Sequence, residues 1–206
     1  TAGVEPAVPA VTLAKRGPRF PKDRLNLPVV EQETDFSCGP ASLLSILRYW
    51  TGFRGTERDL YGPLETTPKD GTEPAKLAEY ARGAGLSAEV REGMTVSDLR
   101  AALGLGRTVI VDLQAWSSTE SARLPWRDRW EDGHYVVLAA MDAENAYFMD
   151  PSAEGALAWV PLSELPERWH DYEDRRGFVR RYERLAIYVR GKSPLKSLPA
   201  PLVRLD

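Results

Sequence analysis

Residues 32–50, which read QETDFSCGPASLLSILRYW, decide the fold that this chain can adopt. The apolar residues in the second half of this segment recur at helical spacing and form one stripe, made of Leu43, Ile46, Leu47 and Trp50. Pro40 lies in the first turn, where a missing N–H costs little, and Gly52 supplies a stop. The pattern predicts a helix over about residues 38–51, with Cys38 at its positive N-terminal end.

The composition is that of an ordinary soluble globular domain. The chain has 206 residues, of which 43% are hydrophobic and 28% charged, and its formal net charge is -3. It is long enough to bury a sizeable core. The charge gives no electrostatic reason to expect nucleic acid or an anionic membrane surface as a partner. No stretch reaches the roughly 18 apolar residues of a membrane-spanning helix, so no integral membrane segment is expected.

Proline-rich segments flank the predicted domain. Residues 1–27 read as an extended N-terminal arm, residues 28–190 as one domain and residues 191–206 as a C-terminal tail. The chain starts at Thr1 rather than Met, and residues 1–9 are rich in Ala, Val and Pro. This start is compatible with export after removal of an unseen signal peptide, and equally with a cytoplasmic location.

Two further helices and a run of strands are predicted after residue 51. A helical pattern starts near residues 72–74 and ends at residue 83 or 85. Thr95 followed by Asp98 resembles a capping box for a short helix that ends near residue 104. Apolar and β-branched runs predict strands at 108–113, 134–140, 146–150, 156–160 and 185–189. Helices followed by adjacent strands indicate an α+β fold with an antiparallel sheet.

Cys38 is the only cysteine in the chain, which excludes an intrachain disulfide and a multi-cysteine metal site. Taken alone, it has three interpretations: a buried small hydrophobic residue, one half of an intermolecular disulfide, or a reactive thiol. A core cysteine has no reason to prefer the start of a helix. The unpaired N–H groups and the helix dipole at that position stabilise a thiolate, so the position favours the reactive thiol.

A thiol nucleophile needs a base within hydrogen-bond reach and a group that orients the base. The chain has two histidines. His134 begins an apolar strand, where its side chain can project from the end of a sheet, whereas His170 lies in a charged segment that reads as a solvated surface turn. His134 is the expected base. An imidazole at a strand end without a catalytic role has the same signature.

Asp150 is the first choice for the orienting carboxylate, because it closes the apolar strand that follows the strand of His134. An aspartate before a proline is also a common turn start. Asp142 and Asn145, in the turn between the two strands, are weaker alternatives.

The oxyanion of a tetrahedral intermediate needs hydrogen-bond donors aimed at it. The backbone N–H of Cys38, at the start of the helix, is one natural donor. The side-chain amide of Gln32, in the preceding loop, is a candidate for the second donor, although a glutamine taken alone reads as a surface residue.

Four motifs in a fixed order resemble the bacteriocin-processing cysteine peptidases, which are papain-like domains that cut peptide precursors, often after a double-glycine leader. The motifs are Gln32, the helix start Cys38-Gly-Pro-Ala-Ser, the strand start Gly133-His-Tyr-Val-Val-Leu, and Asp150-Pro151. Between them, Asp70-Gly-Thr-Glu-Pro-Ala-Lys-Leu-Ala-Glu-Tyr-Ala-Arg looks like the second helix of the family. The resemblance covers about residues 27–190.

The resemblance implies a papain-like cysteine peptidase fold, in which the helix that carries the nucleophile packs on an antiparallel sheet. It implies that Cys38 is the nucleophile, His134 the general base and acid, Asp150 the orienting residue and Gln32 the oxyanion donor. The implied reaction cleaves a peptide or protein substrate through a Cys38 thioester, with no metal or organic cofactor. Many relatives are N-terminal domains of exporters, but this sequence has neither transmembrane helices nor an ATP-binding motif, so a stand-alone domain is expected.

Two other functions use the same set of residues. An amine instead of water can resolve the acyl-enzyme, as in transglutaminase-like acyltransferases of papain-like architecture. Alternatively, the chain is a catalytically inactive peptide-binding module. The sequence does not constrain the oligomeric state.

The connection 114–133 has no secondary-structure pattern of its own and carries Trp116, Trp126 and Trp130. Structureless connections of this length are uncommon in compact domains and often form lids or binding loops. We expect the connection to line or cover the substrate cleft and to confer a preference for hydrophobic or basic-neighbour side chains. The alternative is that its tryptophans cover a satellite core. Its charges are nearly balanced between Glu120, Arg123, Arg127, Asp128, Arg129 and Glu131.

Overall fold

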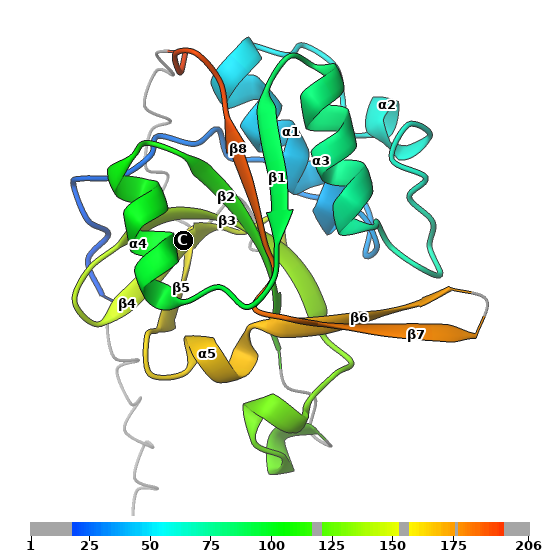
Figure 1. The fold of residues 1–206 in the computed structure, drawn as a ribbon, viewed down its shortest axis with the longest axis vertical. Coiled ribbons are helices and arrows are strands. Elements are labelled where there is room, and N and C mark those ends of the chain that lie inside the picture. The colour runs from blue at the N-terminus through cyan, green and yellow to red at the C-terminus, as the bar shows by residue number, and fades with distance from the viewer. Residues whose placement is uncertain (1–17, 117–120, 153–156, 176, 196–206) are drawn as a thin grey trace, which may run out of the picture.

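The computed structural model describes residues 18–116, 121–152, 157–175 and 177–195, and Figure 1 shows how they are arranged. The helices are α1 (Cys38–Thr51), α2 (Arg58–Tyr61), α3 (Pro74–Gly83), α4 (Val96–Gly104) and α5 (Leu165–Arg168), with 3-10 turns η1 (Ser121–Arg123) and η2 (Trp126–Asp128). The strands are β1 (Ser87–Arg91), β2 (Thr108–Gln114), β3 (Gly133–Met141), β4 (Asn145–Met149), β5 (Leu157–Pro161), β6 (His170–Arg175), β7 (Phe178–Glu183) and β8 (Ala186–Arg190). No helix in these ranges has the length and apolar character needed to cross a membrane.

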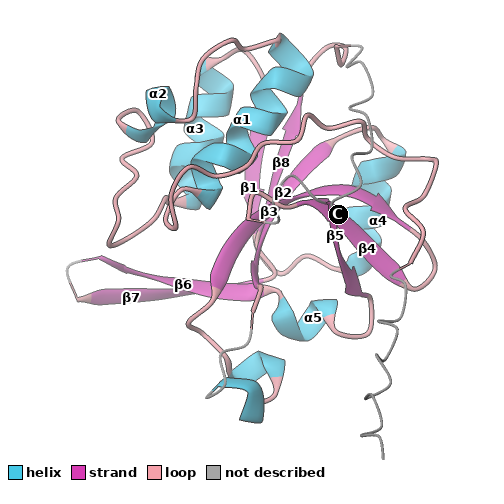
Figure 2. Cartoon of the chain, turned by 180° about the vertical axis from the view of Figure 1, so that it is seen from behind, coloured by secondary structure: helices cyan, strands magenta, loops and turns pink. Residues whose placement is uncertain are grey.

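Six strands of the described chain form one antiparallel sheet in the order β1-β8-β2-β3-β4-β5. Across the central β2–β3 ladder, Asp112 lies opposite Tyr135 and Leu113 opposite His134. β6 and β7 form a separate antiparallel hairpin, which extends away from the main sheet on the same side of the molecule as α1 and α3 (Figures 1 and 2). The expected α+β fold with an antiparallel sheet is confirmed.

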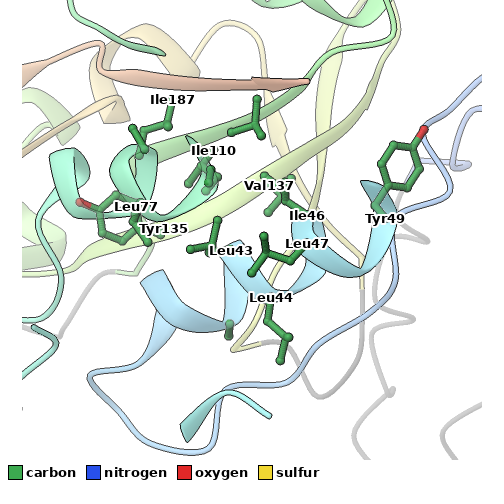
Figure 3. Packing of buried hydrophobic residues seen from close by; sticks show 14 of the residues in the cluster. Leu43, Leu44, Ile46, Leu47, Tyr49, Leu77, Ile110, Tyr135, Val137 and Ile187 are labelled. Atoms are coloured by element: carbon green, nitrogen blue, oxygen red, sulfur yellow. The ribbon is translucent and has the colours of Figure 1, made fainter. Parts of the chain in front are cut away.

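The sheet is buried on both faces, because alternate side chains enter two different apolar clusters. Ile110 of β2 belongs to the cluster that includes α1 and α3, whereas its neighbours Val109 and Val111 belong to the cluster that includes α4 and α5. Figure 3 shows the first cluster, in which Leu43 and Leu47 of α1 lie beside the strands. Burial on both faces explains why every residue of β2 is buried.

α1 is buried around almost its whole circumference, including two serines outside the predicted apolar stripe. The hydroxyl of Ser42 donates to the carbonyl of Tyr135 at 3.1 Å, which ties the helix to β3. The hydroxyl of Ser45 donates to the carbonyl of Pro28 at 2.6 Å, which ties the helix to the start of the domain, directly after the N-terminal arm. These contacts hold the first turns of α1 next to the strand that carries His134.

The predicted helices occur in the structure. α1 begins at Cys38 and ends at Thr51 as predicted, and the helix predicted after residues 72–74 is α3. The capping box of α4 is confirmed, because Thr95 Oγ1 accepts from the Asp98 N–H at 3.2 Å and Asp98 Oδ2 accepts from the Thr95 N–H at 2.8 Å. β1 and the β6–β7 hairpin were not predicted, because these strands are polar and β7 is exposed over most of its length.

The described parts of both chain ends lie on the domain. In the predicted arm 1–27, the N–H of Leu25 donates to the carbonyl of Ala139 at 2.9 Å. In the predicted tail 191–206, the N–H of Leu195 donates to the carbonyl of Tyr49 at 2.9 Å. Residues 1–17, residues 196–206, Glu120 and the first residue of the strand predicted at 156–160 lie outside the described residues.

The prediction that the connection 114–133 is structureless is wrong. Gln114 is the last residue of β2, Gly133 is the first residue of β3, and the turns η1 and η2 lie between them. Trp126 lies between the guanidinium groups of Arg129 and Arg168, each 3.9 Å from its ring centroid. Short turns and cation–π contacts leave no periodic apolar pattern in a sequence, so the pattern could not reveal them.

Candidate active site

Cys38 is the first residue of α1 and its side chain is partly buried. The first N–H groups of a helix have no partner within the helix, so they and the helix dipole favour negative charge at the sulfur. The next residue in the chain, Gly39, has little room for a side chain, because a Cβ there would lie 2.9 Å from the Thr72 side chain. The glycine therefore allows the segment before α3 to pack against the first turn of α1, next to the thiol.

His134 lies between Asp150 and Cys38. Its Nε2 is 2.8 Å from Asp150 Oδ1, and its side chain is 2% exposed. Cys38 lies close enough to the same imidazole to raise its pKa. Because Nε2 faces the carboxylate, Nδ1 is the nitrogen available to the sulfur. The structure thus brings together three of the four predicted site residues around one imidazole.

The electrostatics of these three residues favour a protonated imidazole. Burial by itself lowers the pKa of His134, but the hydrogen bond to Asp150, the interaction with Cys38 and the charges of these two groups outweigh it and raise the pKa to about 9. Burial raises the pKa of Asp150, but the hydrogen bonds from His134 and Ser152 outweigh it and hold that pKa below its usual value. At neutral pH the pair is an imidazolium and a carboxylate.

Ser152 is a site residue that the sequence analysis missed. Its N–H and its hydroxyl donate to Asp150 Oδ1 at 2.8 and 2.7 Å. These two bonds fix the carboxylate at the angle that His134 requires. The signal was present in the sequence, since a serine two residues after an aspartate is typical of a side-chain turn.

Trp116 covers the imidazole. Its ring centroid is 4.7 Å from that of His134, at an interplanar angle of 46°. Trp116 is 47% exposed, so one of its faces meets solvent while it lies against the histidine. A large aromatic ring in this position keeps water from the hydrogen bond between His134 and Asp150.

Gln32, the fourth predicted residue, is attached to the same region through its backbone. Its N–H donates to the carbonyl of Pro151 at 2.9 Å, directly after Asp150. Its side-chain Nε2 donates to the carbonyl of Thr34 at 2.7 Å, and its Oε1 is buried without a hydrogen-bond partner in the described structure. Because an amide nitrogen has two hydrogens, the bond to Thr34 leaves one N–H of Gln32 for another acceptor.

The interpretation of His170 as a residue in a solvated turn is wrong. His170 is the first residue of β6 and is 6% exposed. Its Nε2 is 2.6 Å from the carbonyl of Arg129, and its ring centroid is 4.4 Å from that of Trp130. The charged residues that follow His170 belong to the projecting hairpin, which is why the segment read as surface. His170 fixes the connection 114–133 to β6.

The two weaker candidates for the orienting residue shape the β3–β4 turn. Asp142 Oδ1 accepts from the N–H groups of Glu144 and Asn145 at 2.8 and 2.7 Å. Asp142 Oδ2 accepts from the hydroxyl of Tyr147 at 2.5 Å. These bonds account for Asp142 as a turn residue, whereas Asp150 is the carboxylate that meets His134.

A cavity of about 390 Å³ opens beside Cys38. Thr72 from the segment before α3, Trp130 from the connection, Asp112 from β2 and Asp171 from β6 contribute to its lining. The connection 114–133 therefore lines part of the cavity beside the thiol, through Trp130. Trp126 does not line the cavity and packs instead between Arg129 and Arg168. The sequence analysis missed Asp112 and Asp171, although an aspartate inside the apolar run of β2 was a visible signal.

The carboxyl groups of Asp112 and Asp171 lie close enough to influence each other. Burial, together with the charges of Asp171 and Cys38, raises the pKa of Asp112 well above its usual value. Burial raises the pKa of Asp171 to about 6, against a hydrogen bond in which Gln114 Nε2 donates to Asp171 Oδ1 at 3.3 Å. Of the two, Asp171 is mainly ionised at neutral pH, whereas the shift in the pKa of Asp112 favours its protonated form.

Comparisons with known proteins identify the class of this fold and site. The sequence profile of the Peptidase_C39-like family matches residues 24–176, so the chain belongs to this family. The expected resemblance to the bacteriocin-processing peptidases is thereby confirmed. A search of curated proteins finds no match.

Three solved structures are similar to the chain. The peptidase domain of Streptococcus ComA, a bi-functional ABC transporter of a quorum-sensing pathway, is 17% identical with a TM-score of 0.57, over 80% of this chain and 98% of that one. A putative C39-like peptidase from Bacillus anthracis is 17% identical with a TM-score of 0.59, over 82% and 98%. A double-glycine-motif protease from an AMS/PCAT transporter, solved with its leader peptide, is 18% identical with a TM-score of 0.52, over 81% and 93%. The likeness confirms the papain-like cysteine peptidase fold.

Gly133 has no room for a side chain, because a Cβ there would overlap the carboxyl group of Asp171. We expect Gly133→Ala to lower the free energy of unfolding by about 1–3 kcal/mol, since the buried carboxyl would have to move. Gly83→Ala is the matched control, because nothing lies within 4 Å of the Cβ position at this last residue of α3. Urea denaturation of both variants measures the difference. Equal stability of the two would show that Asp171 does not pack against Gly133.

Proposed function

We propose that the chain is a cysteine peptidase in which Cys38 is the nucleophile and His134 the general base and acid. The observation that supports this most strongly is the environment of His134. Its Nε2 lies 2.8 Å from Asp150 Oδ1, and its imidazole is close enough to Cys38 at the start of α1 for Cys38 to raise its pKa. A nucleophile, a base and a group that orients the base are the three parts that covalent catalysis by a thiol requires.

In the first half of the reaction, the Cys38 thiolate attacks the carbonyl carbon of a peptide bond. The tetrahedral intermediate then collapses and the C–N bond breaks, while His134 donates its Nδ1 proton to the leaving amine. The product is a thioester between Cys38 and the acyl part of the substrate. Asp150 keeps the imidazole in the required orientation and stabilises its positive charge.

In the second half, water enters in place of the amine. His134, now neutral, removes a proton from the water as its oxygen attacks the thioester carbonyl. The carboxylic acid product leaves, and its departure regenerates the thiolate beside an imidazolium. One side chain, His134, carries out every proton transfer in this cycle. Its raised pKa keeps it protonated at neutral pH, as the first step requires.

The oxyanion that forms twice in this cycle has two proposed donors. One is the N–H of Cys38, which points out of the start of α1. The other is the second N–H of Gln32, whose first N–H is bonded to Thr34. The bond to Thr34 supports this assignment, because it fixes the orientation of the Gln32 side-chain amide and identifies its nitrogen, which carries the remaining N–H.

A peptide or protein is the proposed substrate. The AMS/PCAT protease of similar fold was solved with a leader peptide bound, which supports an extended peptide as the ligand of this architecture. In this chain the cavity beside Cys38 is open to solvent and has walls on α1, β2, β3 and the β6–β7 hairpin. Residues from these separate elements can contact a substrate peptide on several sides as it passes over the thiol.

Alkylation of the thiol tests the proposed nucleophile. We expect iodoacetamide to label Cys38 at neutral pH at least about tenfold faster than free cysteine, because His134 and the helix start favour the thiolate. Cys38→Ala is the control for labelling, and mass spectrometry of the intact protein measures it. Labelling no faster than that of the free amino acid would contradict the proposal.

Incubation of peptides with an added amine separates hydrolysis from acyl transfer, and amide adducts in excess of hydrolysis products would make the chain an acyltransferase.

The pH dependence of peptide cleavage tests the role of Asp150. Because His134 must carry a proton for the first step, kcat/KM should fall as the pH rises through about 9. Asp150→Asn keeps a hydrogen-bond acceptor but removes the negative charge that raises the pKa of His134, so this alkaline limb should move to lower pH. Glu144→Gln, which removes a charge from the exposed β3–β4 turn, should leave the limb in place. An unchanged limb in Asp150→Asn would contradict the pairing.

A further inference from the structure

The cavity beside Cys38 is strongly acidic. The acidic side chains in its lining are Asp70, Asp112, Glu131, Asp171, Glu173 and Asp174, and Lys69 is the one Lys or Arg among the described lining residues. Lys69 lies at the rim, because its side chain is 82% exposed, and its Nζ is 3.8 Å from Asp70. The pair of Lys69 and Asp70 is thus nearly neutral, and the remaining charge of the cavity is negative.

Asp112 is the most buried of these carboxyl groups, and Asp171 is its neighbour in the cavity, but one of its two oxygens has no partner among the described residues. It is 4% exposed, and its Oδ1 is buried without a hydrogen bond in the described structure. It sits on the same face of β2 as Ile110, two residues before it, and this face is the one that α1 covers. Buried polar atoms are nearly always hydrogen-bonded, so an unpaired oxygen that lines a cavity is a position for a ligand donor.

Asp171 stands next to Asp112 and is held in place from two sides. Gln114 Nε2 donates to its Oδ1, and Gly133 leaves room for its carboxyl group directly before His134. Burial raises the pKa values of both carboxyl groups, and no described cation lowers either of them. A third carboxylate, Glu173, also has a buried oxygen without a hydrogen bond in the described residues.

The arginines of the hairpin form no ion pair with Asp112 or Asp171 in the described structure. Arg180 Nη2 is 2.8 Å from Glu92 Oε1, and Arg180 lies opposite Glu173 in the hairpin. The guanidinium of Arg181 lies 4.7 Å from the ring centroid of Trp130. Trp130 and Tyr172 add aromatic surface to the lining, which suits the apolar stem and the cationic head of a long basic side chain.

We propose that this cavity binds a lysine or arginine side chain of the substrate, located within two residues of the bond that is cleaved. The proposal rests on the proposed peptidase function and names its substrate class. An extended chain rises about 3.3 Å per residue, so a cavity that contains Cys38 in its lining is reached from the residues nearest the scissile bond. No group of three or more His, Cys, Asp or Glu side chains in the described ranges could hold a metal ion, which favours an organic cation.

The chemistry of the site also indicates how large the preference should be. A guanidinium or ammonium that meets a partly buried carboxylate forms charge-assisted hydrogen bonds, which neutral side chains cannot form. Loss of such a bond corresponds to roughly 10- to 100-fold in binding. A peptidase with this cavity therefore discriminates against glycine, citrulline or glutamate at the position that the cavity receives.

Quenched fluorescent peptides test the proposal directly. Arginine, citrulline and glutamate are placed in turn at each of the four positions nearest the scissile bond, and kcat/KM is measured for the full chain. We expect one position at which arginine exceeds citrulline by about tenfold or more, with glutamate lowest, and a smaller ratio at high salt. Cleavage with equal kcat/KM for arginine and citrulline at all four positions would overturn the inference and leave the peptidase function standing.

Variants assign the preference to the cavity. Asp171→Asn should reduce the ratio of arginine to citrulline by about tenfold, since it removes the ionised carboxyl. Glu144→Gln removes one charge from the exposed β3–β4 turn and should keep the wild-type ratio. An unchanged ratio in folded Asp171→Asn, checked by its thermal unfolding, would overturn the assignment.

A binding measurement separates this inference from the proposed chemistry. Calorimetry of Cys38→Ala with the arginine and citrulline peptides needs no turnover. Tighter binding of the arginine peptide would support the cavity even if the wild-type chain cut neither peptide, a result that would contradict only the peptidase function. Equal binding of the two peptides would overturn the cavity assignment whether or not the chain cleaves them.

Discussion

The hydrogen bond between His134 Nε2 and Asp150 Oδ1 is the interaction on which the rest of the site depends. It selects the tautomer that turns Nδ1 to the thiol, and it places an imidazole at the end of β3 although burial alone would disfavour its charge. Ser152 fixes the carboxylate and Trp116 covers the ring. The residues that make these contacts lie in loops or at strand ends. The strands themselves are held in place by the two apolar clusters on the faces of the sheet.

The second feature of the site is unfavourable for stability. Asp112 and Asp171 are carboxyl groups in a region where burial raises their pKa values, and the described residues offer them no cation. A protein keeps such a pair only where the surrounding packing supports it, and strongly perturbed carboxyls beside a reactive thiol are typical of functional sites. β2, buried on both faces, supplies that support. We therefore assign the acidic cavity to the proposed substrate site and not to a structural ion-pair network.

Much of the fold and part of the site could be predicted from the sequence. α1, α3, α4 and the core strands follow from apolar periodicity and capping signals, and the family motifs pointed to Cys38, His134, Asp150 and Gln32. The β6–β7 hairpin was not predicted because its residues are exposed and charged, and His170 was misread with it. Asp112, Asp171 and Ser152 were missed because their importance lies in contacts between distant elements. Three tryptophans in one connection proved to have separate packing partners, which no local pattern encodes.

Titration of His134 by NMR tests whether Cys38, His134 and Asp150 form one electrostatic unit. The chain has two histidines, so imidazole nitrogen signals can be assigned with the variant His134→Asn. We expect His134 to titrate near pH 9 in the wild type and at lower pH in Cys38→Ala, because Cys38 raises its pKa. A His134 titration near the unperturbed value of about 6.5 in both proteins would show that the three residues do not interact in this way.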